Sequence, residues 1–177
     1  MTGKKDGFLY SYSIRKTPNK GLGVFSEEAI KQGSIVWRHV PGQYCVYDET
    51  TFKALISKMT YDEVVYELTH VFGLADFPDC VIGVLDAGVL LNHSCEHNLV
   101  ANLASGIKPV LDKTSDNYIE DVSEALLDDR YALIATSDIN VGEEFTTNYA
   151  LEIYDPLFLE TLYKQFEIDD SYIDNSQ

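Results

Sequence analysis

Short apolar segments, each ended by turn residues, fill the first fifty positions and constrain the fold more than any other feature of the sequence. Their aromatic and β-branched residues are typical of strands, and turn residues at 18–21 and 31–33 separate them. We expect strands at residues 8–13, 23–25, 34–37 and 43–47. The chain shows no alternation of strands with helices and no glycine fingerprint after a first strand, which argues against a Rossmann-type fold.

A helical insert is expected over about residues 48–79. Apolar residues recur at helical spacing over 52–59 and again over 64–72, which predicts two helices. Thr60 and Glu63 have the spacing of a capping box at the start of the second helix, and Gly73 is placed to end it. We expect both helices to pack into the core and to carry no chemistry.

The second half of the chain again favours short strands. We expect a hairpin over 104–130 with an exposed tip near 112–124, and a strand over 131–136. Asp155 followed by Pro156 predicts the start of a helix over about 155–167, with Asp as N-cap and Pro at the first helical position. The acidic residues 169–177 are expected to be disordered. The remaining length suits a single core, so we expect residues 1–168 to form one domain.

Charge and composition limit the classes of partner. The formal net charge is −16, which argues against direct binding of nucleic acid, because that affinity depends on Lys and Arg. A basic protein or peptide is the partner that such a negative field would attract; a merely solvated acidic surface is the alternative. The sequence contains no apolar run of about 18 residues, the length that would predict a membrane span. We expect no signal peptide, and the three cysteines indicate an intracellular protein, cytoplasmic or nuclear.

A turn that contains glycines and a polar segment are candidates for ligand binding. Gly21 and Gly23 leave the backbone bare around Leu22, where a ligand could approach, although a simple tight turn also explains them. Residues 91–98 read Leu-Asn-His-Ser-Cys-Glu-His-Asn between apolar runs. So polar a segment must find partners if buried, either in a structural network or in a ligand site.

A metal site is another interpretation of the same polar segment. His93, Cys95 and His97 alternate, so on a strand they would share one face. No paired Cys-x-x-Cys accompanies them, and we therefore predict no bound metal.

The third segment, residues 135–149, reads as a strand, a turn at 140–142 and a second strand that leads to Tyr149. Taken in order, the three segments resemble the SET domain family of protein-lysine methyltransferases over about residues 20–149. The resemblance implies a mainly β fold with short helices (α+β). This is the SET-type β-clip of several small sheets, with a C-terminal pseudoknot and a helical insert.

The resemblance also implies a site and an activity. The activity is methyl transfer from S-adenosylmethionine to lysine of a histone or another basic protein, with Tyr149 as catalytic residue. The implied cofactor-binding residues are Gly21, Leu22, Gly23, Asn92, His93, Tyr149 and Phe158. The implied substrate channel comprises His39, Tyr44, Thr147 and Tyr154. The aromatic residue over the adenine is left open among Tyr154, Phe158, Tyr163 and Phe166.

The sequence departs from the family pattern in several places. Residues 89–91 read Val-Leu-Leu where many members have Arg-Phe, and Arg38-His39 stands where Glu-Tyr is common. No cysteine follows Cys95, so the family's zinc site after the domain is not expected. Asn148 stands where Asp is common. The alternative to an enzyme is therefore a SET-like module that binds a basic peptide or protein without turnover.

Overall fold

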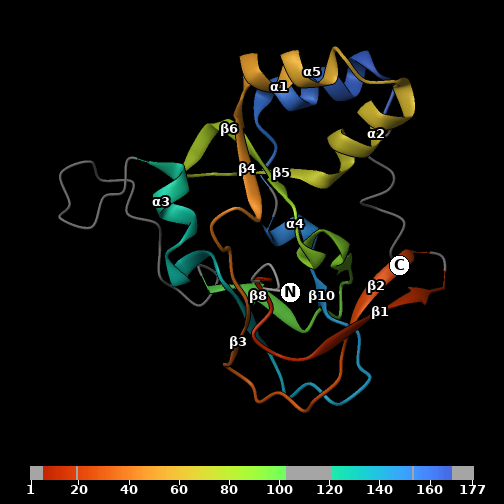
Figure 1. The fold of residues 1–177 in the computed structure, drawn as a ribbon, viewed down its shortest axis with the longest axis vertical. Coiled ribbons are helices and arrows are strands. Elements are labelled where there is room, and N and C mark those ends of the chain that lie inside the picture. The colour runs from red at the N-terminus through yellow and green to blue at the C-terminus, as the bar shows by residue number, and fades with distance from the viewer. Residues whose placement is uncertain (1–5, 19, 103–120, 153, 169–177) are drawn as a thin grey trace, which may run out of the picture.

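The computed structural model describes residues 6–18, 20–102, 121–152 and 154–168 (Figure 1). The strands are β1 (Tyr12–Thr17), β2 (Gly21–Ser26), β3 (Ile35–Trp37), β4 (Tyr44–Asp48), β5 (Val71–Leu74), β6 (Phe77–Val84), β7 (Asn92–His93), β8 (Leu99–Ala101), β9 (Leu133–Ala135) and β10 (Thr146–Thr147). The helices are α1 (Glu49–Ile56), α2 (Tyr61–His70), η1 (Ala87–Leu90), α3 (Val122–Leu126), η3 (Asp129–Tyr131), α4 (Tyr149–Glu152) and α5 (Leu157–Gln165). None of the helices in these ranges is long and apolar enough to cross a membrane.

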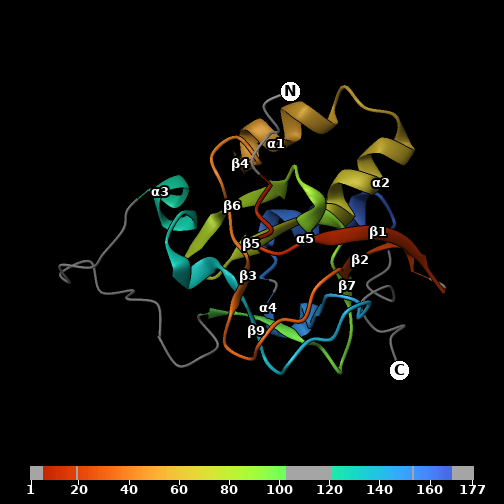
Figure 2. The same cartoon turned by 60° about the horizontal axis from the view of Figure 1, so that its bottom comes forward.

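The strands pair into small sheets rather than one large sheet. β1 pairs with β2 as a hairpin, β3–β9–β8 and β4–β6–β5 are antiparallel three-stranded sheets, and β10 lies parallel to β7. The predicted mainly β fold of small sheets is therefore confirmed. In Figure 1 α1 and α2 lie at one end of the molecule and β3 lies toward the other. Figure 2 again shows α1 and α2 together at one end, with β9 at the opposite end.

The helical end has its own core. Residues of α1, α2, β5, β6 and α5 form one cluster, with Phe52, Leu68, Val81 and Leu159 fully buried. Asp48 caps α1 by accepting from the Thr51 amide at 2.7 Å. The capping box between Thr60 and Glu63 is present as predicted, and these caps fix where the two helices begin.

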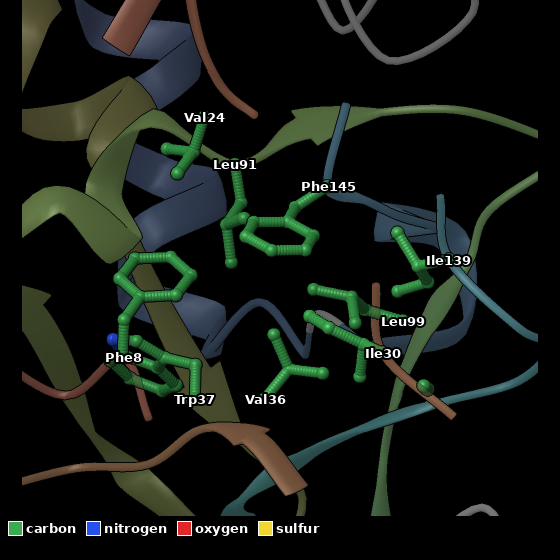
Figure 3. Close-up of a cluster of buried hydrophobic side chains, with 10 residues drawn as sticks. Phe8, Val24, Ile30, Val36, Trp37, Leu91, Leu99, Ile139 and Phe145 are labelled. Carbon is green, nitrogen blue, oxygen red and sulfur yellow. The ribbon is translucent and has the colours of Figure 1, made fainter. Parts of the chain in front are cut away.

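The sheet end has a second core, drawn in Figure 3. Phe8 stacks on Phe145 with ring centroids 5.6 Å apart. The buried cluster consists of Phe8, Val24, Ile30, Val36, Trp37, Leu91, Leu99, Ala135, Ile139 and Phe145. Its members come from strands and loops far apart in the sequence, so burial of this cluster holds the three motif segments together.

Several local expectations were wrong. The helix α2 ends at His70, and Val71–Leu74 forms β5, which pairs with β6. A β-branched residue and an aromatic residue at positions 71 and 72 suit that pairing. The first strand is Tyr12–Thr17, while Phe8 makes only an isolated bridge to Trp37.

Two more corrections concern the second half. Residues 122–126 form α3, which Asp121 caps through the amides of Ser123 and Glu124, where a hairpin was expected. The helix α5 begins at Leu157 with Pro156 as its N-cap and no capping side chain, so Asp155 is not the N-cap. The greater part of the predicted hairpin tip at 112–124 and all of the predicted acidic tail lie outside the described residues.

Candidate active site

The polar segment 92–98 lies beside residues 143–147, at the point where the pseudoknot was expected. β7 and β10 are parallel partners, with Asn92 opposite Thr146. The Ser94 amide donates to the Thr147 carbonyl at 2.9 Å. The segment thus finds its hydrogen-bond partners in a strand about fifty residues away, which satisfies the polar groups that the sequence places among apolar runs.

Asn98, which sequence reasoning did not select, is the centre of this pairing. Its amide nitrogen donates to Glu143 Oε1 at 3.1 Å and to the Glu144 carbonyl at 2.8 Å. Its oxygen accepts from the Thr146 amide at 3.0 Å. Because Asn98 is buried, these bonds fix the register of the two segments.

Asn92 ties the glycine turn to the closing strand. Its Nδ2 donates to the Leu22 carbonyl at 3.0 Å and to Glu144 Oε1 at 2.7 Å. A Cβ on Gly23 would lie 2.3 Å from that carboxylate oxygen and 2.9 Å from Asn92 Nδ2. Glycine at position 23 therefore admits the Asn92–Glu144 pair, whereas the sequence suggested that it admits a ligand.

His93 and Tyr149 orient one another. The Tyr149 amide donates to His93 Nδ1 at 3.0 Å, and the two rings lie edge to face with centroids 5.3 Å apart. The Tyr149 hydroxyl donates to the Leu91 carbonyl at 2.5 Å. Burial, helped by the charges of Lys20 and His97, lowers the pKa of His93, which favours the neutral imidazole that accepts the amide proton.

A cavity of about 810 Å³ opens between the two cores. Its wall is formed by Lys20, Gly21, Leu22, Trp37, His39, Thr69, His70, Val71, Phe72, Leu74, Ala75, Asp76, Val84, Gly88, Val89, Leu90, Leu91, Asn92, Ala101, Tyr131, Leu133, Thr147, Tyr149, Tyr154, Asp155 and Tyr163. Most of the surface of this wall is apolar, and polar side chains from several segments interrupt it. Size and composition suit a site for a cofactor together with part of a second substrate.

The structure brings most of the expected site residues to this cavity. On its wall lie Gly21, Leu22, Asn92, Tyr149, Thr147, His39 and Tyr154. Away from the wall lie Gly23, His93, Tyr44 and Phe158. Gly23 lies beside the wall residue Asn92, and His93 accepts from the amide of the wall residue Tyr149. The Tyr44 and His39 rings lie edge to face, with centroids 5.5 Å apart.

The C-terminal segment contributes different aromatics from the one singled out in the sequence. Phe158 packs into the helical core, with its ring centroid 6.4 Å from that of Phe52. Tyr154 and Tyr163 lie on the cavity wall instead. The Tyr154 carbonyl accepts from the Gly73 amide at 2.9 Å, and the Tyr163 hydroxyl donates to the Leu68 carbonyl at 3.1 Å.

His39 is the least accessible polar residue on the wall, with 5% of its surface exposed. Its ring lies edge-on to Trp37, with centroids 4.5 Å apart. Burial lowers the pKa of His39 to about 4, because the charged imidazolium loses its hydration there. Among the described residues Nδ1 has no hydrogen-bond partner, so His39 presents a neutral ring to the cavity region.

Two of the three candidate metal ligands, His93 and Cys95, lie close together. Cys95 Sγ lies 3.9 Å from His93 Nε2. Within the part of the chain that the structure describes, no group of three His, Cys, Asp or Glu side chains could hold a metal ion.

The family follows from comparison with known proteins. The SET domain family model matches residues 21–150, and the chain belongs to this family. No curated protein matches the chain as a relative.

The fold is shared with solved SET domain structures. The Neurospora SET domain protein DIM-5, a histone lysine methyltransferase, matches with a TM-score of 0.51 and 21% identity, over 84% of this chain and 55% of that one. Apo ctPRC2 in an autoinhibited state matches with a TM-score of 0.54 and 15% identity, over 89% of this chain and 17% of that one. The autoinhibited ctPRC2 bound to S-adenosylmethionine gives the same values. The chain thus spans about half of DIM-5 and a smaller part of the ctPRC2 chain.

Proposed function

We propose that this chain is an S-adenosylmethionine-dependent protein-lysine N-methyltransferase that acts on a basic protein. One observation carries the proposal: the glycine turn at Gly21, the Asn92 amide and the Tyr149 ring all reach the wall of a single cavity. They come from three distant segments, and the hydrogen bonds of Asn92 and Asn98 hold these segments together. Such convergence is expected of a reaction site and is not needed for packing alone.

The residues present fit the cofactor. Leu22 and Leu90 offer apolar surface, while Asn92 offers a polar group for the amino-acid part. Tyr154 and Tyr163 supply aromatic surface from the C-terminal segment, which is suited to a purine ring. When bound, S-adenosylmethionine supplies an electrophilic methyl group.

The protein has to deliver a neutral lysine amine in line with that methyl group. A free lysine has a pKa of ~10.4 and is protonated at neutral pH. Transfer into a cavity walled by Trp37, Phe72 and Leu133 disfavours the ammonium and lowers the lysine pKa. The bond to the Leu91 carbonyl fixes the Tyr149 hydroxyl, whose oxygen can accept a hydrogen bond from the amine and orient it.

The substrate class follows from charge. The chain carries 29 acidic against 13 basic residues, and Asp76 and Asp155 are among the residues of the cavity wall. This field attracts a basic segment, and a histone, the substrate class named for DIM-5, has that chemistry. We place the activity inside the cell.

A binding module without turnover is the second candidate. It is favoured by His39, which occupies a position where the family often has tyrosine and which is buried without a partner for Nδ1 among the described residues. Such a module would hold cofactor or peptide and leave the lysine unmodified.

The two candidates are separated by methyl transfer itself. Wild-type protein and labelled S-adenosylmethionine are incubated with an array of lysine-containing basic peptides, and products are read by mass spectrometry. We expect a mass increase of one or more methyl groups on a defined lysine. Binding of a peptide with no transfer on any peptide would favour the binding module. Absence of cofactor binding would overturn the enzyme, and absence of both cofactor and peptide binding would overturn both candidates.

A further inference from the structure

A half-buried carboxylate, that of Asp86, joins three segments next to the cavity. Its Oδ2 accepts from the Gly7 amide at 2.8 Å, and its Oδ1 accepts from the Gly88 amide at 2.8 Å. Trp37 Nε1 donates to the same carboxylate and lies 3.2 Å from each oxygen. One side chain therefore ties the N-terminal residues 6–8, the strand β3 and the helix η1 to one another.

Two of these partners, Trp37 and Gly88, are residues of the cavity wall, whereas Asp86 itself is not. Trp37 pairs with Leu133 across the sheet, and the His39 ring lies edge to face with the indole at a centroid distance of 4.5 Å. Leu133 and His39 are wall residues as well. The position of the indole therefore affects the shape of the wall beyond Trp37 alone.

The backbone approaches the indole and the carboxylate closely at two glycines. A Cβ on Gly7 would lie 2.5 Å from Trp37 Nε1 and 2.9 Å from Asp86 Oδ2. A Cβ on Gly88 would lie 2.8 Å from Trp37 Nε1 and 2.9 Å from Asp86 Oδ1. Any larger residue at either position would separate the indole from the carboxylate, because a gap of that size admits no further carbon atom. The bond between Trp37 and Asp86 thus has closely fitted surroundings.

A carboxylate in this place contributes little to stability by itself. Burial raises the pKa of Asp86, and the donors Gly88, Gly7 and Trp37 act in the opposite direction. Among the described residues no Lys or Arg forms an ion pair with it. A buried charge held by neutral donors gains little net free energy. Such a fully bonded polar group instead fixes one arrangement of its neighbours.

We propose that Asp86 is a positioning residue for methyl transfer, whose carboxylate fixes the Trp37 indole so that the cavity wall holds the substrate's lysine side chain in line with the methyl donor. The inference rests on the proposed function, because it takes Trp37 as part of the wall that receives the lysine. Asp86 touches neither substrate nor cofactor in this account and acts through Trp37.

Two changes, alone and combined, test this assignment. Asp86→Asn keeps the size of the side chain and removes its charge. Trp37 is the only tryptophan of the chain, so feeding β-(3-benzothienyl)alanine in place of tryptophan alters this residue alone and removes only its N–H. Each change should lower kcat/KM for the best peptide about tenfold, because a small misplacement of the wall disturbs the in-line geometry.

The combined variant separates positioning from a structural role. Its kcat/KM should fall no further than that of either single variant, because the two groups act as one unit. The melting temperature should behave differently. Asp86→Asn weakens the bonds to the Gly7 and Gly88 amides in both backgrounds, so it should lower the melting temperature by a similar amount in each. Affinity for S-adenosylhomocysteine should stay within about threefold of wild type, because Asn92 keeps its bonds.

Asp48→Asn is the matched control. The Asp48 carboxylate accepts from the Thr51 amide at 2.7 Å and caps α1 at the helical end, and Asp48 is not on the cavity wall. The same loss of one negative charge should leave kcat/KM within about twofold of wild type.

Several results would overturn the assignment. One is wild-type kcat/KM in a folded Asp86→Asn protein. Another is a further tenfold fall when Asp86→Asn is added to the benzothienyl protein, which would show that Asp86 acts through residues 6–8 or η1 and not through Trp37. If Asp86→Asn does not fold, the benzothienyl protein decides: a tenfold fall supports the assignment, and wild-type kcat/KM overturns it.

The proposed function has a separate outcome. In each of those cases methyl transfer by the wild-type protein still supports it. A wild-type protein that transfers no methyl group to any peptide overturns the proposed function and this inference with it.

Discussion

Both ends of the molecule have an apolar core, and at the sheet end polar links between the motif segments are added to it. At the sheet end, the motif segments are joined by side-chain hydrogen bonds across long stretches of sequence, such as those of Asn92 and Asn98. At the helical end, α1, α2 and α5 meet through apolar contacts around Phe52 and Leu159. The cavity lies between them, and both ends contribute to its wall. Polar links fix the geometry of the reacting groups, while apolar packing encloses the site.

The largest expected effect is on the helical core. Phe52 is fully buried, and Phe52→Ala should lower the free energy of unfolding by about 3–5 kcal/mol. Chemical denaturation measures this loss. Protein that remains folded should lose at most about fivefold in affinity for S-adenosylhomocysteine. Tyr163 packs in the same cluster as Phe52, but Gly21 and Asn92 lie at the other end. A selective loss of cofactor affinity without loss of stability would break the division between the two ends.

A change to the polar links should differ from Phe52→Ala in its effect on cofactor binding. Asn98→Ala removes three hydrogen bonds and leaves the buried Thr146 amide unpaired, at a cost of about 3 kcal/mol. Cofactor affinity should fall as well, because the register of residues 92–98 is lost. Asn140→Ala is the control. Asn140 is exposed, and among the described residues its side chain bonds only to Glu143, so its effect should stay within ~0.5 kcal/mol.

His39, at the junction of the two ends, should make stability depend on pH. Its pKa is lowered to about 4 in the folded protein, below ~6.5 for an unfolded histidine. The unfolded state therefore binds the proton more readily, and stability falls as pH drops from 6.5 towards 4. Between pH 7 and pH 5 the loss should be about 2 kcal/mol.

Comparison with a variant isolates this contribution from that of the carboxylates. His39→Phe suits the aromatic surroundings of Trp37 and Tyr44 and cannot be protonated. Denaturation of both proteins at pH 7 and pH 5 should show a smaller acid-side loss for the variant. Equal losses would mean that the imidazole is hydrated in the folded protein.

The sequence predicted the sheet end better than the helical end. The order and spacing of the motif segments carry the resemblance to the SET domain family, and that resemblance assigned Asn92 and Tyr149 to one site before their positions were known. The partner of Asn92 could not be predicted, because Glu144 lies 52 positions further on and nothing local marks the pairing.

At the helical end the apolar spacing in the sequence led to wrong predictions. The apolar spacing that predicts α2 continues through Val71, and only pairing with β6, a tertiary interaction, converts residues 71–74 to a strand. The rotation of α5 about its axis is likewise set by packing against Phe52, which turns Phe158 into the core and leaves Tyr163 on the wall. Neither outcome follows from periodicity alone.

Tyr149→Phe tests the central claim most directly. The change keeps the ring beside His93 and removes only the hydroxyl that bonds to Leu91, so unfolding free energy should change by about 1–2 kcal/mol at most. Tyr61→Phe removes a similar bond, to the Phe166 carbonyl, at an exposed site and is the matched control.

The measurement is the rate of methyl transfer to the best peptide by both variants, with S-adenosylhomocysteine affinity measured alongside. For Tyr149→Phe we expect kcat/KM to fall about a hundredfold or more because the amine loses its orientation, with affinity within about threefold. Tyr61→Phe should match wild type. A folded Tyr149→Phe protein with wild-type turnover would contradict the assignment of Tyr149 as the catalytic residue.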